Sequence, residues 1–449
     1  MVVLMVVPVV WGKTLSISIC RFDSLSDRLR KSLTYDAADN TNKPDFRELD
    51  LGSLVSPLRA GPAASSSSSS SGSVSGRTGS GPRSAVTVNN HSGNHIRKLI
   101  LFPSQISMEA AAKTTPWFSL PWKRRILFSV VSTAIAVVSR RDGTVNRRLV
   151  KFLDFRTPPT TKPINGVKTY DIVVDSSRKL WFRVFVPVQH AVEHLPVLVF
   201  FHGGGFVYLA PDKDIYDAFC RRIARKLPAI VVSVNYRLAP EHRYPEQHDD
   251  CFDVLKFLDD EENCLESLPE KTNISRCFLA GDSAGGNLVH HVAQRACEFN
   301  FQRLKVTGML SIQPFFGGEE RTNSEKQFEG RTPLASLKQT DWYWNAIMPP
   351  GESNNRDHPI INVSGPMAVD ISKLDFPATM VVVAGFDFLY DWQKRYCEWL
   401  KKSGVAVDVV EYPKMFHAFY VFPELPESEQ LMWDVKEFIH KVLMKVCLV

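Results

Sequence analysis

The strongest constraint on how this 449-residue chain folds is one stretch of seven residues, Gly281-Asp282-Ser283-Ala284-Gly285-Gly286-Asn287. It follows a short apolar run typical of a buried parallel strand, and it opens a run with helical spacing of apolar residues. Serine in G-x-S-x-G between a strand and a helix is typical of a nucleophile elbow. The turn is so tight that larger residues flanking Ser283 would collide with the neighbouring backbone. The pattern predicts a serine hydroxyl exposed at the end of the strand, above a helix N-terminus that favours negative charge.

From Tyr170 onward the chain alternates between strand-like and helix-like runs. Strands are expected over residues 171–175, 180–186, 196–201, 230–234, 276–280, 309–312, 379–384 and 405–412. Helices are expected over residues 214–227, 247–258, 287–295, 389–403 and 429–442. This order predicts an α/β fold with a mostly parallel, doubly wound sheet that is entered by an antiparallel hairpin. The interval at 313–377, about 65 residues, is too long for a plain loop and predicts an inserted helical piece beside the site.

A second motif, His202-Gly203-Gly204-Gly205-Phe206, follows the expected strand at 196–201. Consecutive glycines let backbone N–H groups turn toward a ligand oxygen, which side chains would obstruct. Directed at a carbonyl oxygen, such groups form an oxyanion hole, whose expected donors are Gly203, Gly204 and the N–H of Ala284. A Gly-rich turn or a phosphate loop is the alternative, but no Lys-Ser/Thr pair follows and no acidic ribose partner lies at the expected distance. His202 is expected to be a structural hydrogen-bonding group in this loop.

An acyl-transfer site also needs an acid and a base, which follow the serine in that order in this kind of fold. Asp387 comes just after an expected strand, so we expect it at the same edge of the sheet as the serine. Asp391, one helical turn further on, is the alternative acid. His417 lies on a loop before the last helix and is the expected base, a position that His358 and His440 fit less well.

These residues predict hydrolysis of a small-molecule ester through a covalent acyl-enzyme. Ser283 attacks the ester carbonyl while His417 accepts its proton, and Asp387 fixes the imidazole tautomer and stabilises the imidazolium. The glycine N–H groups hold the oxyanion, and water then releases the acyl group. We expect neither a cofactor nor a metal ion to take part.

Taken together, the motifs resemble those of a known family. They are HGGGF at 202–206, NYRLAPEHRYP at 235–245, GDSAGGN at 281–287, the G-x-D-x-L-x-D run at 385–391 and the late His417. The chain is similar to the hormone-sensitive-lipase branch of the α/β-hydrolases, and more narrowly to the plant carboxylesterases, from about Met108 to the C-terminus. The resemblance implies an α/β-hydrolase fold in which residues 108–150 form a helical lid over the pocket and 151–449 form the catalytic domain.

Plant gibberellin receptors belong to the same group, and Asp142-Gly143-Thr144-Val145-Asn146-Arg147 resembles their lid segment. The resemblance implies that such receptors have lost the catalytic histidine and carry Ser at the third glycine of HGGG. This chain keeps both His417 and Gly205, which favours an esterase. A receptor-like protein that binds a small molecule without catalysis is the alternative. One departure from the family pattern is Phe388, where many relatives have Pro, and it leaves Asp387 in place.

Residues 1–107 have no counterpart in this resemblance. Ser and Gly dominate 61–83, which cannot bury enough apolar surface to fold, so we expect 1–107 to be disordered. An artefactual extension of the reading frame is the other interpretation of this segment. Residues 1–11 lack the basic region of a secretory signal, and the acidic residues between 23 and 50 argue against a transit peptide.

Charge, hydropathy and cysteine usage narrow the class of protein further. The formal net charge is +6, of which five charges lie in 1–107, so we expect no basic surface for nucleic acid on the remainder. The apolar run at 126–138 is shorter than the 20 or so residues of a transmembrane helix, and it predicts an amphipathic helix instead of a membrane span. Eight scattered cysteines without zinc-site spacing suit a reducing compartment such as the cytoplasm or the nucleus.

Overall fold

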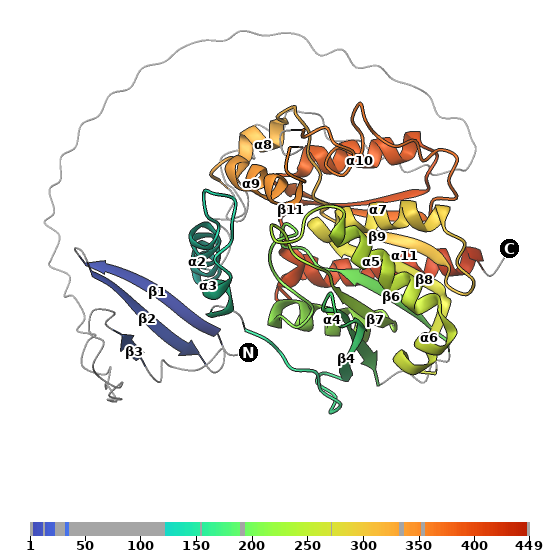
Figure 1. Cartoon of the computed structure of the whole chain (residues 1–449), viewed down its shortest axis with the longest axis horizontal. Helices are drawn as coiled ribbons and strands as arrows, with labels where there is room; N and C mark the ends of the chain where they lie inside the picture. Colours follow the sequence, from blue (N-terminus) through green and yellow to red (C-terminus); the bar gives the residue numbers. More distant parts are fainter. Residues whose placement is uncertain are drawn as a thin grey trace, which may run out of the picture. The chain divides into compact units, whose positions relative to one another are not determined.

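A computed structural model describes residues 3–11, 14–22, 32–35, 122–152, 155–188, 194–270, 272–331, 336–351 and 355–446. The chain forms two compact units, Met1–Lys113 and Thr114–Val449. The second unit is built around an eight-stranded sheet in the order β11-β10-β9-β8-β6-β7-β5-β4 (Figure 1). Its strands are β4 (Val167–Asp175), β5 (Leu180–Pro187), β6 (Leu195–Phe201), β7 (Ile230–Asn235), β8 (Thr272–Asp282), β9 (Val306–Ile312), β10 (Ala378–Phe386) and β11 (Val407–Phe416).

The sheet is parallel over most of its width. β4 and β5 form an antiparallel hairpin, and β5 also pairs antiparallel with β7. Among the other six strands, from β7 to β11 in the sheet order, every neighbouring pair is parallel. Their sequences are near-continuous apolar runs because parallel strands are covered on both faces, and in β6 every residue except Pro196 is buried. The predicted fold class and the predicted entry hairpin are confirmed.

Helices cover both faces of this sheet (Figure 1). They are α4 (Asp214–Lys226), α5 (Glu246–Asp259), α6 (Glu261–Ser267), α7 (Ala284–Glu298), α10 (Tyr390–Lys402) and α11 (Pro426–Val446). One apolar cluster contains Val254 of α5, Leu288 of α7 and Tyr396 of α10. A second cluster contains Phe219 of α4 and Val435 of α11. Because the two clusters use alternate residues of the same strands, the sheet is buried on both sides.

The long interval between β9 and β10 contains the predicted inserted helices, α8 (Asn323–Phe328) and α9 (Leu337–Ile347). α8 begins with a capping box, in which the Thr322 hydroxyl accepts from the backbone of Glu325 and the Glu325 carboxylate accepts from the backbone of Thr322. In α9, Trp344 is buried and stacks on Phe315 with ring centroids 4.0 Å apart. This aromatic stacking joins α9 to Phe315, which lies just after the end of β9.

Two helices precede β4. α2 (Trp122–Val138) contains the predicted amphipathic run and begins four residues before it, and α3 (Arg147–Phe152) follows after a short bridge between Ser139 and Val145. Among the residues that the structure describes, every helix is too short or too polar to cross a lipid bilayer. Residues 108–121 of the expected lid lie outside the described residues.

The first unit differs from the expected disorder of 1–107. It contains a three-stranded antiparallel sheet formed by β1 (Val3–Trp11), β2 (Thr14–Phe22) and β3 (Ser32–Tyr35). The physical reason lies in composition, because β1 and β2 are rich in Val, Ile and aromatic residues, which favour strands. The expected disorder of 1–107 rested on the Ser-rich and Gly-rich run at 61–83, and for that run it stays a prediction. That run itself lies outside the described residues.

Candidate active site

Ser283 lies between β8 and α7, where the sequence predicted a nucleophile elbow. Its backbone has φ 52° and ψ −115°, a left-handed conformation that is strained for a residue with a side chain. Backbone hydrogen bonds hold it there, because its N–H donates to the carbonyl of Ile312 at 2.9 Å and its carbonyl accepts from Phe315 at 2.8 Å. A Cβ at Gly285 would overlap the carbonyl oxygen of Phe201, so only glycine permits this approach of helix to strand.

The candidate acid Asp387 and the candidate base His417 directly follow the ends of two neighbouring strands, β10 and β11. In the parallel pair β10–β11, Phe386 is opposite Phe416, so the next residues, Asp387 and His417, begin at the same level. Their side chains meet, with His417 Nδ1 2.7 Å from Asp387 Oδ2. Since a carboxylate only accepts hydrogen bonds, Nδ1 carries the hydrogen and Nε2 is the basic nitrogen. Burial disfavours the imidazolium, but the charge and hydrogen bond of Asp387, with a contribution from Asp282, raise the pKa of His417 above its usual value.

The alternative residues are placed elsewhere. Asp391 Oδ2 accepts from the backbone N–H of Ser324 at 2.7 Å, in the first turn of α8, so its carboxylate anchors the inserted helix. His358 packs its ring against Tyr244 with centroids 5.5 Å apart, and His440 is exposed on α11. Only Asp387, of the two candidate acids, contacts His417.

Two glutamines that the sequence analysis did not identify hold Asp387 in place. Gln313 donates from Nε2 to Asp387 Oδ2 at 3.0 Å and accepts at Oε1 from the backbone of Ala418 at 2.8 Å. Gln393 donates to the same Oδ2 at 2.9 Å, and the Leu389 N–H donates to Oδ1 at 2.9 Å. The buried carboxylate is thus fully satisfied. Gln313 comes directly after β9, as Ser283 comes directly after β8, so both lie at the same edge of the sheet. This position after an expected strand was the one signal in the sequence that could have identified Gln313 as a residue of the site.

The three expected oxyanion donors, Gly203, Gly204 and Ala284, are not equally available in the structure. The N–H of Gly203 lies 2.9 Å from Asp282 Oδ1 and 2.7 Å from the hydroxyl of Tyr216, so this donor is already used inside the protein. By contrast, the N–H groups of Gly204, Gly205 and Ala284 have no hydrogen-bond acceptor in the part of the chain that the structure describes. Gly204 has φ +109°, and a Cβ there would overlap the carbonyl oxygen of Tyr208. The open donors are therefore the second and third glycines, together with Ala284.

His202 supports this loop from within the core, as the sequence suggested. Its ring stacks on Tyr236 with centroids 4.3 Å apart, and its Nδ1 lies 2.8 Å from the carbonyl of Gly203. The hydroxyl of Tyr236 donates to the His202 carbonyl at 2.7 Å. Complete burial lowers the pKa of His202 to about 4, so the ring is neutral near pH 7 and is no candidate for the base.

Comparisons with known proteins agree with the observed fold. A family model described as the alpha/beta hydrolase fold matches residues 198–421. The gibberellin receptor GID1C of Arabidopsis thaliana is 40% identical over 334 residues, which are 72% of this chain and 94% of the receptor. The chain belongs to the α/β-hydrolase family.

Other relatives of this α/β-hydrolase carry esterase names. Carboxylesterase 20 of Arabidopsis thaliana is 32% identical and covers 68% of this chain and 95% of its own length. The structure of a hyperthermophilic esterase from the archaeon Pyrobaculum calidifontis superposes with a TM-score of 0.53 at 29% identity, covering 63% of this chain and 87% of that one. The fold and the carboxylesterase-like character of the chain follow from these similarities.

The segment formed by α2 and α3, residues 122–152, contacts this hydrolase beside its glycine loop. Arg147 donates to the carbonyls of Val207 and Ala239, both at 2.6 Å, and forms two hydrogen bonds with the carboxylate of Glu241. The hydroxyls of Ser139 and Tyr208 lie 2.7 Å apart. These polar contacts place the segment next to Val207 and Tyr208, which follow the glycine loop.

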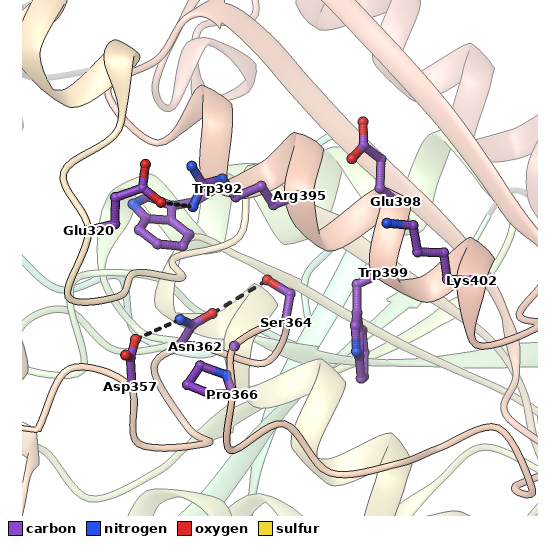
Figure 2. Close-up of a pocket in the computed structure, with 11 residues that line it drawn as sticks. Glu320, Asp357, Asn362, Ser364, Pro366, Trp392, Arg395, Glu398, Trp399 and Lys402 are labelled. Atoms are coloured by element: carbon purple, nitrogen blue, oxygen red, sulfur yellow. Dashed lines mark hydrogen bonds and ion pairs between the residues drawn. The ribbon is translucent and has the colours of Figure 1, made fainter.

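Figure 2 shows a separate pocket of about 370 Å³ along α10. An ion pair between Glu320 and Arg395, 2.9 Å apart, lies in its wall. The pocket is lined by Glu320, Asp357, Asn362, Ser364, Gly365, Pro366, Trp392, Arg395, Glu398, Trp399 and Lys402, and by none of the three proposed catalytic residues. Within the described ranges, no group of three or more His, Cys, Asp or Glu side chains is arranged to hold a metal ion.

Proposed function

We propose that this α/β-hydrolase is a serine carboxylesterase that cleaves short-acyl or aromatic esters of small molecules. The observation that carries the proposal is the 2.7 Å hydrogen bond between His417 and the buried Asp387, at the sheet edge where Ser283 occupies the elbow. A nucleophile, a base and an orienting acid in this relation are the set that acyl transfer requires.

In the first half of the reaction, His417 Nε2 takes the proton of Ser283 while the Ser283 oxygen attacks the ester carbonyl. Asp387 holds the imidazole in the tautomer that exposes Nε2 and stabilises the imidazolium, without taking the proton itself. The N–H groups of Gly204, Gly205 and Ala284 stabilise the oxyanion, and each such donor contributes about 10²–10³ in rate. The imidazolium then protonates the alcohol that leaves.

In the second half, His417 removes a proton from water, and the resulting hydroxide attacks the acyl-enzyme carbonyl. The same three N–H groups hold the second oxyanion. When it collapses, the bond to Ser283 breaks, the serine regains its proton from His417, and the carboxylic acid leaves. The N-terminus of α7, directly after Ser283, favours negative charge in both halves.

The test is hydrolysis of p-nitrophenyl acetate and butyrate by the purified full chain. We expect a burst and steady turnover from the native protein and neither from Ser283→Ala. Ser177→Ala, at an exposed turn between β4 and β5, is the matched control and is expected to keep the native rate. Native-level turnover in Ser283→Ala would remove the nucleophile assignment.

A second candidate function is receptor-like binding of a small acid such as a gibberellin, without turnover. The observations that favour it are the 40% identity to a gibberellin receptor and the contacts that Arg147 makes from the segment 122–152. The intact Ser283, Asp387 and His417 set argues against it, because binding alone gains nothing from an activated nucleophile. Calorimetry with gibberellins distinguishes the two: saturable binding by a native chain without ester turnover supports the receptor function, and no heat at high micromolar ligand disposes of it.

A further inference from the structure

Asp282, the residue before the nucleophile, joins three separate parts of the site. Its side chain is 3% exposed. Its Oδ1 accepts from the N–H of Gly203 at 2.9 Å. Its Oδ2 accepts from the hydroxyl of Tyr216, in the first turn of α4, at 2.8 Å, and from the hydroxyl of Tyr420 at 2.6 Å. Tyr420 belongs to the short helix η3 (Phe419–Val421), which begins two residues after His417.

The carboxylate carries its charge without a basic partner. Among the residues that the structure places, no Lys or Arg forms an ion pair with Asp282. Burial raises the pKa of Asp282 above its usual value, while its three hydrogen-bond donors act in the opposite direction. Three donors converging on one side chain match an ionised carboxylate, which only accepts. The charge of His417 interacts with that of Asp282, as well as with that of Asp387.

We propose that Asp282 is a positioning residue for the esterase reaction, which clamps the glycine loop and the His417 turn to the elbow and whose charge stabilises protonated His417. This role rests on the function proposed above.

The first part of this role follows from the sheet. β6 and β8 are parallel neighbours with Phe201 opposite Gly281, so the glycine loop leaves the sheet alongside Asp282. With the N–H of Gly203 turned inward to Asp282, the following N–H groups of Gly204 and Gly205 are the ones left without an acceptor among the described residues. The hydrogen bonds of the Gly203 N–H to Asp282 and to Tyr216, which itself donates to Asp282, thus determine which glycine donors are available to an oxyanion.

The second part of this role is electrostatic. When His417 takes the proton from Ser283, its imidazolium lies in the field of two carboxylates: Asp387, at 2.7 Å, and Asp282, whose Oδ2 accepts from Tyr420 three residues after His417. In a buried site such fields are screened far less than in water. Asp282 therefore makes His417 a stronger base for the step in which the serine oxygen attacks.

The other titratable groups that face Asp282 are neutral near pH 7. From α4 they are Tyr216 and Cys220, from the end of β7 Tyr236, and from η3 Tyr420, and burial raises the pKa of each of the four. His202, which faces Lys213, has a pKa lowered by burial to about 4. Other ionisable groups lie on this side, Lys213 near His202 and Asp217 near Cys220, but the charges that raise the pKa of His417 are those of Asp387 and Asp282.

The test is Asp282→Asn in the full chain, because Asn keeps the acceptor for Gly203 and the shape of the side chain while removing the charge. We expect kcat for p-nitrophenyl butyrate to fall about tenfold, less than the 10²–10³ lost with an oxyanion donor, with KM nearly unchanged. We expect the acid limb of the kcat/KM profile to move to lower pH, because His417 loses one of its two carboxylates. A fall in kcat with an unmoved acid limb would reduce Asp282 to a structural residue and overturn the proposal.

A second pair of variants keeps the test decisive if Asp282→Asn does not fold. Tyr420→Phe removes one clamp donor, and Tyr396→Phe removes an equally buried hydroxyl that contacts His290 at 3.1 Å, away from Asp282. We expect Tyr420→Phe to lower kcat several-fold relative to Tyr396→Phe. Equal kcat values in the two variants would overturn the proposal that Asp282 holds the His417 turn through Tyr420.

A readout without turnover separates this inference from the proposed function. The NMR titration of the His417 ring, assigned by its loss in His417→Gln, reports the pKa directly. We expect a lower midpoint in Asp282→Asn than in the native chain, whether or not any ester is hydrolysed, and an equal midpoint would overturn the electrostatic role. Absence of native turnover with a shifted midpoint would instead reject the esterase.

Discussion

The proposed catalytic residues and the α2–α3 segment at 122–152 are built in different ways. Asp387 is fully buried and receives four hydrogen bonds, two of them from glutamine side chains. The segment is half exposed, with Val131 and Val137 39% and 62% exposed on α2. It is attached by the polar contacts of Arg147 and by two buried apolar side chains, Val138 and Val145.

The difference has a physical cause and a functional consequence. A buried carboxylate must have its lone pairs satisfied, since each unsatisfied group costs several kcal/mol, so its surroundings have one arrangement. Exposed ion pairs contribute about 0–1 kcal/mol each and are easily exchanged with water. A site that must hold charges in place is expected to be rigid, whereas a segment held in part by exposed polar contacts is expected to detach more readily.

Loss of the orienting acid gives the largest expected effect. Asp387→Asn keeps the shape of the side chain but stabilises the wrong imidazole tautomer, and in a comparable triad this lowers kcat about 10⁴-fold. Turnover of p-nitrophenyl butyrate measures it. Asp391→Asn, which keeps an acceptor for Ser324, is the control and is expected to retain nearly all activity. A large loss in the control and not in Asp387→Asn would exchange the roles of the two carboxylates.

Removal of residues 1–150 tests whether the segment is needed at all. Val138 and Val145, 3% and 7% exposed, lie in the main apolar cluster, and each such side chain contributes about 1.5–3 kcal/mol through burial. We expect this truncated chain to aggregate or to lose most of its activity. Size-exclusion chromatography and ester turnover measure both, and a soluble, fully active product would show that the segment is dispensable.

Lowering the pH is expected to affect the site before the fold. The pKa of His417 is raised above 6.5, so the imidazole loses its basic form and activity falls as the pH drops through that raised value. Below it, kcat/KM should fall about tenfold per pH unit. The segment 122–152 contains no histidine, so the fall of kcat/KM at low pH should be the same in the native chain and in a variant in which Arg147 is replaced.

Unfolding should follow at lower pH. Burial lowers the pKa of His202 and His291 to about 4, against 6.5 for an exposed histidine. The unfolded chain therefore binds more protons between these values, and the free energy of unfolding decreases as the pH falls through this window. The contribution of His417 to the free energy of unfolding has the opposite dependence on pH, because its pKa is raised in the folded chain. This stabilisation is present below pH 6.5 and is lost as the pH rises through the pKa of His417 in the folded chain. Circular dichroism during acid titration measures the combined effect of these histidines on the free energy of unfolding. Unfolding at a higher pH than the loss of activity would contradict the expected order.

Arg147→Ala should weaken the attachment of the segment without damaging the site. It removes hydrogen bonds from a charged donor to two backbone carbonyls, each worth about 1.5–3 kcal/mol at most, and an exposed ion pair with Glu241 worth about 0–1 kcal/mol. We expect KM to rise several-fold and kcat to change less than twofold, with exposed Arg141→Ala as the control. A fall in kcat comparable to that of Asp387→Asn would make the segment part of the catalytic machinery.

The smallest effect is expected from removing residues 1–107. The reason is that the family resemblance begins near Met108. We expect the melting temperature and the esterase rate to remain almost unchanged, as measured by thermal unfolding and by turnover. A loss similar to that caused by removing residues 1–150 would mean that the boundary of the folded region lies nearer to the N-terminus.

Much of the fold and part of the site could be predicted from local sequence. The alternation of apolar runs predicts the sheet because a strand and a helix bury their faces with different periods. Ser283 could be assigned because a tight turn between two small residues needs no distant partner. The first 35 residues show the limit: a Ser-rich run elsewhere in 1–107 led to a prediction of disorder, whereas strands occupy 3–11, 14–22 and 32–35.

The sequence by itself determined the order of the elements, the proposed nucleophile and the short set of candidates for acid and base, because these depend on spacing within a few residues. Tertiary structure decided that Asp387 and not Asp391 meets His417, and that the N–H of Gly203 is used by Asp282. It also brought together Asp282 and Tyr420, which are 138 residues apart. A backbone N–H, a glutamine amide or a tyrosine hydroxyl has no distinctive pattern in the sequence, and its role exists only once folding places an acceptor beside it.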